Sequence, residues 1–428
     1  MFARTVTPER RGRAAPCATI GVVGVGAVAR RGVGLGVVLA CLAGSLGLSL
    51  AWKAPCASGA WDDGRQYRWF CYSDIVPLYT TEQLSGGRLP YLEPCAPAPG
   101  NCDEYPVLTM YAMRAAAWAA GPRAGFAGFF YANAALLAAA AAATAVCLFL
   151  LAGRRALAFA LAPTLLIYAF VNWDLLAVAL ATWATLLHRD RRDVGAGALL
   201  GLGAATKLYP ALLVVPFALE RLREREPDRA VHVAWAAGGA WLAVNLPFAV
   251  LAPRGWWEFF RFNAARPPDW DSLWYLACDR IGGAACLPTA AVNLLAPGLF
   301  LGLVVLVHRL RARRDPGYER WTLALPLLVL FLLTNKVYSP QYGLWLLPWF
   351  ALGRPGLGWF AAFQAADVAV FLTRFSWFAR YGGWGGLPIG AFEVAVLLRA
   401  AVLAWCVAVW IRGAREPTPA RAALAETG

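Results

Sequence analysis

Apolar runs separated by short charged or polar segments repeat along almost the whole chain. Such runs are typical of transmembrane helices, because a helix needs about 20 mainly apolar residues to cross the hydrocarbon core. The sequence therefore predicts an all-α, polytopic integral membrane protein with about 12 transmembrane helices. They are expected near residues 33–52, 126–152, 156–171, 174–188, 194–206, 208–220, 231–251, 289–308, 321–334, 342–353, 357–372 and 391–411.

Two long polar stretches interrupt this pattern, at residues 53–125 and 252–288, and we expect both to be extracytoplasmic loops. Residues 33–411 then form a single transmembrane domain. A basic N-terminal segment, 1–32, and a C-terminal tail, 412–428, are expected in the cytoplasm. The first loop ends in an amphipathic stretch that either lies along the membrane surface or crosses it as a further span.

The charged residues are distributed unequally between the two sides of the membrane. The predicted topology places 24 basic and 11 acidic residues on one side and 14 of each on the other, and it leaves Arg399 inside the last span. An excess of Lys and Arg marks the cytoplasmic side, so both termini are expected there. The formal net charge of +14 then reflects topology and does not indicate nucleic-acid binding. A composition of 60% hydrophobic and 15% charged residues also excludes an ordinary soluble protein and makes the lipid bilayer an expected partner.

Six of the ten cysteines fall in the predicted outer loops, where the compartment is oxidising. No histidine is expected on that side, so a zinc site is the poorer interpretation. An even number of outer cysteines indicates disulfides. The simplest pairings are local: Cys56 with Cys71, Cys95 with Cys102, and Cys278 with Cys286.

Three segments are predicted to be short hairpins. They turn at Asn172-Trp173-Asp174, at Lys207-Leu208-Tyr209-Pro210 and at residues 335–342. Their arms have about 10 to 16 residues and reach roughly 15 to 24 Å, against a hydrocarbon core of about 30 Å. The tips should therefore stop below the outer surface, where polar groups are tolerated only in an enclosed or wet cavity. We expect a polar pocket in the outer leaflet, formed by the three tips.

Two of these tips carry a lysine in a similar pattern, in which Lys207 or Lys336 is followed by a tyrosine and then a proline. A repeated cation at membrane depth indicates a shared anionic ligand such as a lipid phosphate. The alternative is that each ammonium group only reaches the lipid headgroups. Under the first interpretation, further tip side chains bind the same substrate: Asn172, Asp174, Tyr209, Tyr338, Gln341 and Tyr342.

An outer active site in this chain needs a carboxylate as its proton acceptor, because all three histidines lie at cytoplasmic ends of predicted spans. Asp74 lies near the middle of the first outer loop, and Glu104 directly precedes Tyr105-Pro106. Either carboxylate can accept the proton of an attacking hydroxyl group.

Asp269-Trp270-Asp271 in the second outer loop looks like the Asp-x-Asp metal motif of nucleotide-sugar transferases. We expect no metal there, because nucleotide sugars are not normally found outside the membrane. Trp270 and the neighbouring tryptophans either stack on a sugar ring or anchor the loop at the membrane interface.

Taken together, these motifs give the chain a family resemblance. It resembles the polytopic GT-C glycosyltransferases and, within them, the family 87 mannosyltransferase-like proteins of actinobacteria. The resemblance covers roughly residues 35–411. It rests on Tyr72-Ser73-Asp74-Ile75, Glu104-Tyr105-Pro106, Asn172-Trp173-Asp174, Lys207-Leu208-Tyr209-Pro210, and Asn335 to Tyr342 followed by Leu344-Trp345-Leu346-Leu347-Pro348.

The resemblance implies a GT-C-like fold in a bacterial plasma membrane, with an extracytoplasmic active site. In this superfamily the general base is an aspartate of the first outer loop, which matches Asp74. Asp74 lies farther from the first span than is usual there, so Glu104 stays as the alternative. Lys207 and Lys336 would stabilise the lipid-phosphate leaving group.

The implied reaction transfers a hexose, mannose in particular, from a polyprenyl-phosphate-linked donor to a hydroxyl group, with inversion at the anomeric carbon. The acceptor would be a glycolipid, a polysaccharide or a protein. No metal or cofactor is implied, since the lipid-linked sugar is a substrate. Two alternatives are a transporter or flippase of a lipid-linked sugar and a non-catalytic protein of envelope assembly. Against the flippase, the polar residues gather on one side of the membrane, whereas alternating access needs a site near the midplane.

Overall fold

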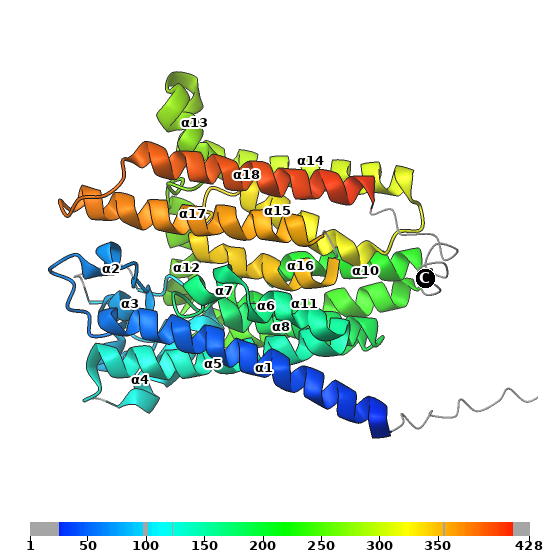
Figure 1. Cartoon of the computed structure of the whole chain (residues 1–428), viewed down its shortest axis with the longest axis horizontal. Helices are drawn as coiled ribbons and strands as arrows, with labels where there is room; N and C mark the ends of the chain where they lie inside the picture. The colour runs from blue at the N-terminus through cyan, green and yellow to red at the C-terminus, as the bar shows by residue number, and fades with distance from the viewer. Residues whose placement is uncertain (1–24, 97–101, 122, 354–355, 414–428) are drawn as a thin grey trace, which may run out of the picture.

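The computed structural model describes residues 25–96, 102–121, 123–353 and 356–413. These residues are mainly helical and include no strand, and most of the helices run side by side along the long axis of the molecule (Figure 1). The long helices are α1 (Val25–Lys53), α5 (Gly125–Ala152), α11 (Pro227–Leu251), α14 (Thr289–Arg314), α17 (Leu357–Tyr381) and α18 (Ile389–Arg412).

Shorter helices fill the bundle and its outer end. Within the bundle they are α6 (Leu157–Ala160), α7 (Pro163–Tyr168), α8 (Asp174–Arg189), α9 (Asp193–Thr206), α10 (Val214–Arg223), α15 (Ala324–Thr334) and α16 (Leu347–Gly353). The two predicted outer loops contain α2 (Arg65–Arg68), α3 (Ile75–Thr81), α4 (Val107–Ala120), α12 (Pro253–Ala265) and α13 (Leu273–Ile281).

Five helical segments of the described chain are long and apolar enough to cross a membrane: Gly34–Cys56, Gly125–Ala160, Pro227–Leu251, Thr289–Arg314 and Ile389–Arg412. They confirm the predicted all-α, multi-pass membrane protein. The number of spans stays a prediction, because the remaining helices are shorter or more polar.

The start of α1 and the end of α18 lie at the same end of the bundle (Figure 1), as an even number of crossings requires. The expected cytoplasmic segments, 1–32 and 412–428, lie largely outside the described residues, which begin at residue 25 and end at residue 413. Their location in the cytoplasm remains a prediction.

Proline interrupts three of the expected spans. The expected span 156–171 is split because α6 ends at Ala160 and α7 begins at Pro163, which has no N–H to continue the preceding helix. The expected spans 208–220 and 342–353 begin as 3-10 turns that start at Tyr209 and Pro340 and only then become α10 and α16. The second arm of two hairpins is therefore short, and the polar tips stay within the bundle.

Helix α9, which ends one residue before the tip residue Lys207, packs closely against α11. A Cβ atom added at Gly197 would lie 2.3 Å from the Val233 carbonyl oxygen, and one added at Gly201 would lie 2.2 Å from that of Ala237. Small residues four positions apart allow helix backbones to approach in this way in membranes. This contact fixes α9 and hence the position of Lys207.

The outer end of the molecule is held together by disulfides. The structure pairs Cys56 with Cys71, Cys95 with Cys102, and Cys278 with Cys286, which are the expected local pairings. The first joins the end of α1 to the loop that leads to Asp74, and the second joins the two sides of the segment before Glu104. Both candidate bases thus lie on covalently tethered loops.

Candidate active site

Asp74 lies where three distant parts of the chain meet. Its carboxylate accepts hydrogen bonds from the Tyr72 hydroxyl at 2.8 Å and from Asn172 Nδ2 at 2.8 Å, and Gln341 Nε2 lies 3.5 Å away. Its backbone N–H donates to the Val171 carbonyl at 2.9 Å. The first outer loop and two of the predicted tips are thereby joined around one carboxylate.

Asn172 connects Asp74 to the cation of the second tip. While its amide nitrogen donates to Asp74, its Oδ1 accepts a hydrogen bond from Lys207 Nζ at 3.3 Å. Lys207 Nζ lies 3.3 Å from Asp174 Oδ1, and Asp174 also accepts a hydrogen bond from Trp345 Nε1 at 2.6 Å. Asp174 is fully buried. Asn172 and Asp174 were both expected to bind the substrate. Asn172 instead holds Asp74 and Lys207, and Asp174 holds Lys207, and neither residue lines the cavity described below.

The tip tyrosines take different roles. Lys207 lies between the rings of Tyr105 and Tyr342, with its ammonium 5.1 and 5.2 Å from their centroids. Tyr209 and Tyr342 each stack on Trp345, at 4.2 and 4.0 Å between centroids. Tyr338, also expected at the ligand, instead packs under Arg399 with its ring 3.7 Å from the guanidinium carbon, because the chain turns it towards the buried side of α18.

Lys336 forms a second positive centre with a residue that the sequence did not single out, Arg266. Lys336 Nζ donates to the carbonyl oxygens of Asn263 at 2.7 Å and Ala264 at 3.2 Å, and within the described chain it forms no ion pair with a carboxylate. Burial, and then the nearby Arg266, lower the pKa of Lys336 to about 8. Arg266 is bonded to Asp269 at 2.7 Å, so the pair keeps an excess positive charge.

These groups line one cavity of about 1550 Å³. Its wall includes Asp74, Glu104, Lys207, Tyr209, Arg266, Lys336, Gln341 and Tyr342, together with aromatic side chains such as Tyr67, Trp270, Trp377 and Trp384. The volume exceeds the 300–1,000 Å³ or so that is usual for one small ligand. The cavity therefore has room for more than one substrate group, with a carboxylate on one part of its wall and cations on another.

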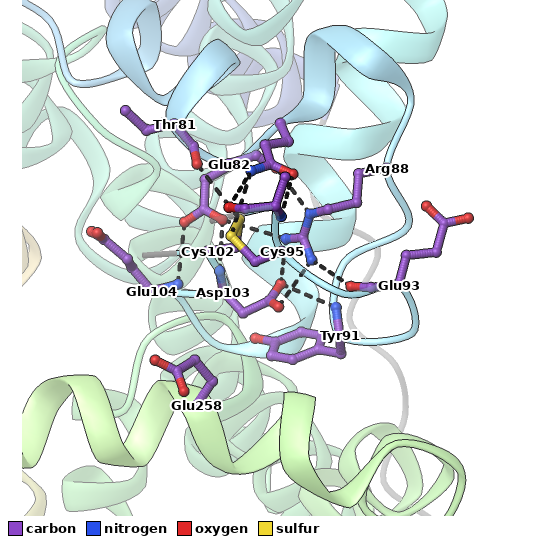
Figure 2. Close-up of a disulfide and its surroundings, with 12 residues drawn as sticks. Thr81, Glu82, Arg88, Tyr91, Glu93, Cys95, Cys102, Asp103, Glu104 and Glu258 are labelled. Atoms are coloured by element: carbon purple, nitrogen blue, oxygen red, sulfur yellow. Dashed lines mark hydrogen bonds and ion pairs between the residues drawn. A yellow bond between two sulfur atoms is a disulfide. The ribbon is translucent and has the colours of Figure 1, made fainter. Parts of the chain in front are cut away.

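Glu104 is the second carboxylate at the cavity, and a buried network sets the position of its backbone (Figure 2). The Glu82 carboxylate accepts hydrogen bonds from the N–H groups of Asp103 at 2.6 Å and Glu104 at 3.1 Å. Arg88 binds both oxygens of Asp103, at 2.7 and 3.1 Å. The Glu104 side chain points away from this network, and burial raises its pKa to about 7 despite the opposing charge of Arg266.

Comparison with known sequences shows which family the chain belongs to. The sequence model of glycosyltransferase family 87 matches residues 104–340, more than half of the chain. The chain belongs to glycosyltransferase family 87. This family 87 protein is therefore a glycosyltransferase, and the resemblance to family 87 is confirmed. The matched range includes Glu104, Lys207 and Lys336 and begins after Asp74.

Among solved structures, the crystal structure of ArnT from Cupriavidus metallidurans bound to undecaprenyl phosphate is similar to this glycosyltransferase over 88% of this chain and 77% of that chain. The sequence identity is 15% and the TM-score is 0.44. No curated protein matches the sequence significantly.

The Asp-x-Asp motif of this glycosyltransferase is bonded within the protein. Asp269 binds Arg266 and lies 3.6 Å from Arg374, while Asp271 binds Arg374 at 2.7 Å and lies 3.6 Å from Arg399. Both carboxylates thus anchor the second outer loop to α17 and α18. Trp270, between them, faces the cavity.

Lys53 was also missed by the sequence analysis. The chain contains only three lysines, Lys53, Lys207 and Lys336, against 36 arginines, and all three lie around Asp74 or its cavity. Lys53 is fully buried at the end of α1 and donates to backbone carbonyls of the loop that leads to Asp74. The rarity of lysine in an arginine-rich chain was the available signal.

Proposed function

We propose that this glycosyltransferase transfers a hexose, mannose in particular, from a polyprenyl-phosphate-linked donor to an acceptor hydroxyl group on the extracytoplasmic side of the membrane. The observation that carries the proposal is that one cavity joins a held carboxylate, Asp74, to the positive pair Lys336 and Arg266. Mannose is proposed from the resemblance to mannosyltransferase-like proteins, and the outer location from the distribution of arginine along the chain.

The proposed reaction is a single displacement at the anomeric carbon. The acceptor oxygen forms a bond to this carbon while the bond from the carbon to the phosphate oxygen breaks. The acceptor proton passes to Asp74, and the polyprenyl phosphate leaves with the negative charge. Attack on the face opposite the leaving group inverts the configuration. Lys336 and Arg266 stabilise the charge that develops on the phosphate, which is the effect that dominates in reactions of this type.

Asp74 is favoured over Glu104 as the base because its orientation is fixed. Two hydrogen bonds, from Tyr72 and Asn172, hold its carboxylate, and a carboxylate has further lone pairs available for the acceptor hydroxyl. Within the described residues, no hydrogen bond to the Glu104 carboxylate is formed. A positioned base is worth more than a mobile one, because the loss of a near-attack geometry slows the reaction.

A lipid-linked donor is supported by where the positive pair lies. Lys336 follows α15, an apolar helix of 11 residues that is only about 16 Å long and therefore too short to cross the hydrocarbon core. A phosphate at that depth is reached most directly by a ligand that enters from the bilayer. Both carboxylates of the Asp-x-Asp motif are bonded to arginines, which argues against their use for a metal-bound nucleotide sugar.

The direct test uses the purified protein in lipid nanodiscs with polyprenyl-phosphate-[14C]mannose and a lipid and glycan extract of bacterial envelopes. We expect label to appear in a product other than the donor, with inverted configuration by NMR. Proteoliposomes with the same donor separate this outcome from transport. Label that crosses the membrane chemically unchanged, with no product, would contradict the proposal.

A further inference from the structure

Lys53 occupies a position that simple stability does not explain. An ionisable side chain in a membrane-spanning helix is costly and is usually functional. Lys53 is 0% exposed, although it lies only three residues before Cys56, where the candidate span ends. A long side chain so near the end of a span normally extends to the headgroups. Lys53 turns inward instead.

The ammonium group of Lys53 binds the loop that carries Asp74. Its Nζ donates to the carbonyl oxygens of Tyr72 at 2.9 Å and Phe70 at 3.2 Å. The ring of Phe371 lies 5.1 Å from the ammonium and provides a cation–π contact. In the chain as described, no carboxylate forms an ion pair with Lys53.

Trp52 of α1 and Cys56, in the turn that follows α1, reinforce this contact. Trp52 Nε1 donates to the Trp69 carbonyl at 2.8 Å, and Cys56 is joined to Cys71. We call Trp52, Lys53 and Cys56 the α1 clamp. It contacts four consecutive residues, 69–72. One of them, Phe70, has a φ of 56°, which an aromatic residue rarely adopts. The clamp therefore holds a backbone conformation that the loop would not favour alone.

The far side of the same loop is fixed by another part of the chain. The Ser73 hydroxyl donates to the Phe170 carbonyl at 2.7 Å, and the Asp74 N–H donates to the Val171 carbonyl. Residues 69–74 are thus bonded at one end to the end of α1 and at the other to the segment after α7. Tyr72 lies at the junction: its carbonyl accepts from Lys53, and its hydroxyl donates to Asp74 at 2.8 Å.

We propose that Lys53 is a positioning residue for the general base. By binding the carbonyls of Phe70 and Tyr72 it sets the Tyr72 hydroxyl and, through it, the orientation of the Asp74 carboxylate towards the cavity. This inference rests on the proposed function only in the assignment of Asp74 as the base. The disulfide holds the loop near α1, whereas the ammonium group determines its local conformation.

The test compares Lys53→Met, which keeps the length of the side chain but removes its donors, with Lys53→Arg, which keeps charge and donors. Arg68→Met is the matched control, because Arg68 is an exposed cation of the same loop. Lys53→Met should lower kcat on the order of 10²-fold, as a displaced catalytic group does, with the donor KM unchanged. Lys53→Arg should restore much of kcat, and Arg68→Met should match the wild type.

Two further readouts separate positioning from general destabilisation. In an Asp74→Asn background, Lys53→Met should cost little additional kcat, because both changes act through the same carboxylate. Hydrogen exchange followed by mass spectrometry should become faster in residues 69–76 of Lys53→Met and stay unchanged elsewhere. This second readout does not depend on any donor. It therefore tests whether Lys53 holds residues 69–76 even if the wild type transfers nothing from polyprenyl-phosphate-mannose, a result that would refute the proposed function alone. Wild-type exchange in residues 69–76 of Lys53→Met, or wild-type kcat, would overturn the role of Lys53.

Discussion

Replacing Lys336 with glutamine tests the positive pair that we assign to the donor phosphate. The change removes the charge, while the glutamine amide can still donate to the carbonyl oxygens of Asn263 and Ala264, which Lys336 Nζ binds at 2.7 and 3.2 Å. The loop should therefore keep its conformation. Any loss of activity then reports on the charge.

The expected loss follows from the surroundings of the ammonium group. Lys336 is 9% exposed and has no carboxylate partner in the described part of the chain, so its charge is available to a ligand. A pair of unit charges about 4 Å apart interacts by about 4 kcal/mol at an effective dielectric constant of about 20. Removal of one group that stabilises a developing oxyanion typically lowers kcat by about 10²–10³-fold. We expect a loss in this range for kcat/KM with the lipid-linked donor.

The assay measures initial rates with polyprenyl-phosphate-[14C]mannose for the wild type, Lys336→Gln and Lys336→Arg. Arg261→Gln is the matched control, since Arg261 lies in α12 of the second outer loop but is 61% exposed. Among the described residues it pairs only with Glu258 of the same helix. Lys336→Arg should retain most of the activity, and Arg261→Gln should match the wild type. Transfer of mannose by Lys336→Gln within about threefold of the wild type would contradict the assigned role of Lys336, because the loss of a charge in contact with the phosphate lowers the rate far more than that.

Three further predictions concern pH and packing. Burial and Arg266 lower the pKa of Lys336 to about 8, so the ammonium loses its proton as pH rises through this value. In a pH–rate profile, kcat/KM for the donor should therefore fall above pH 8. Lys336→Arg should abolish this fall, and an unchanged fall in this variant would contradict the assignment of Lys336 to the donor phosphate. Burial raises the pKa of Glu82 to about 8, above its value of 4.5 in the unfolded chain, so its contribution to stability is complete below pH 4.5 and is lost as pH rises through 8. Between pH 4.5 and 8, the Tm of Glu82→Gln should therefore depend less on pH than the Tm of the wild type. The same dependence of Tm on pH in both proteins would contradict the raised pKa of Glu82. Gly201→Ala should destabilise the protein by on the order of 1–3 kcal/mol in thermal unfolding, since its Cβ would lie 2.2 Å from the Ala237 carbonyl oxygen. Gly238→Ala should not destabilise the protein, because a Cβ added there has nothing within 4 Å. Equal Tm values for the two variants would argue against the close contact of α9 and α11.

The membrane fold and the family could be predicted from the sequence, because both depend on signals that run along the chain. Apolar runs determine the spans, and the short arms on either side of polar tips such as Lys207 place those tips inside the bundle. The local cysteine pairings were the simplest of those possible, because the members of each pair, such as Cys95 and Cys102, lie close in sequence. The break before Pro163 could not be predicted from apolarity, because the apolar run continues through it from α6 to α7.

The roles of individual site residues could be predicted less well, because they depend on which side chains face each other. Asp174 and Lys207 were both assigned to the substrate, but their opposite charges bring them together at 3.3 Å. Arg266 lies far from Lys336 in sequence and carries no motif of its own. Lys53 resembles an ordinary interfacial lysine until its contacts with the loop before Asp74 are known.

The role of Asp74 as the base is tested most directly by the transfer of mannose by Asp74→Asn and Glu104→Gln, compared with the wild type at the same donor concentration. We expect Asp74→Asn to lose roughly 10²–10⁴-fold in kcat, the usual contribution of a positioned general base, with the donor KM unchanged. Glu104→Gln should retain most of the wild-type kcat. Full transfer by Asp74→Asn, or a loss confined to Glu104→Gln, would contradict the assignment of Asp74 as the base.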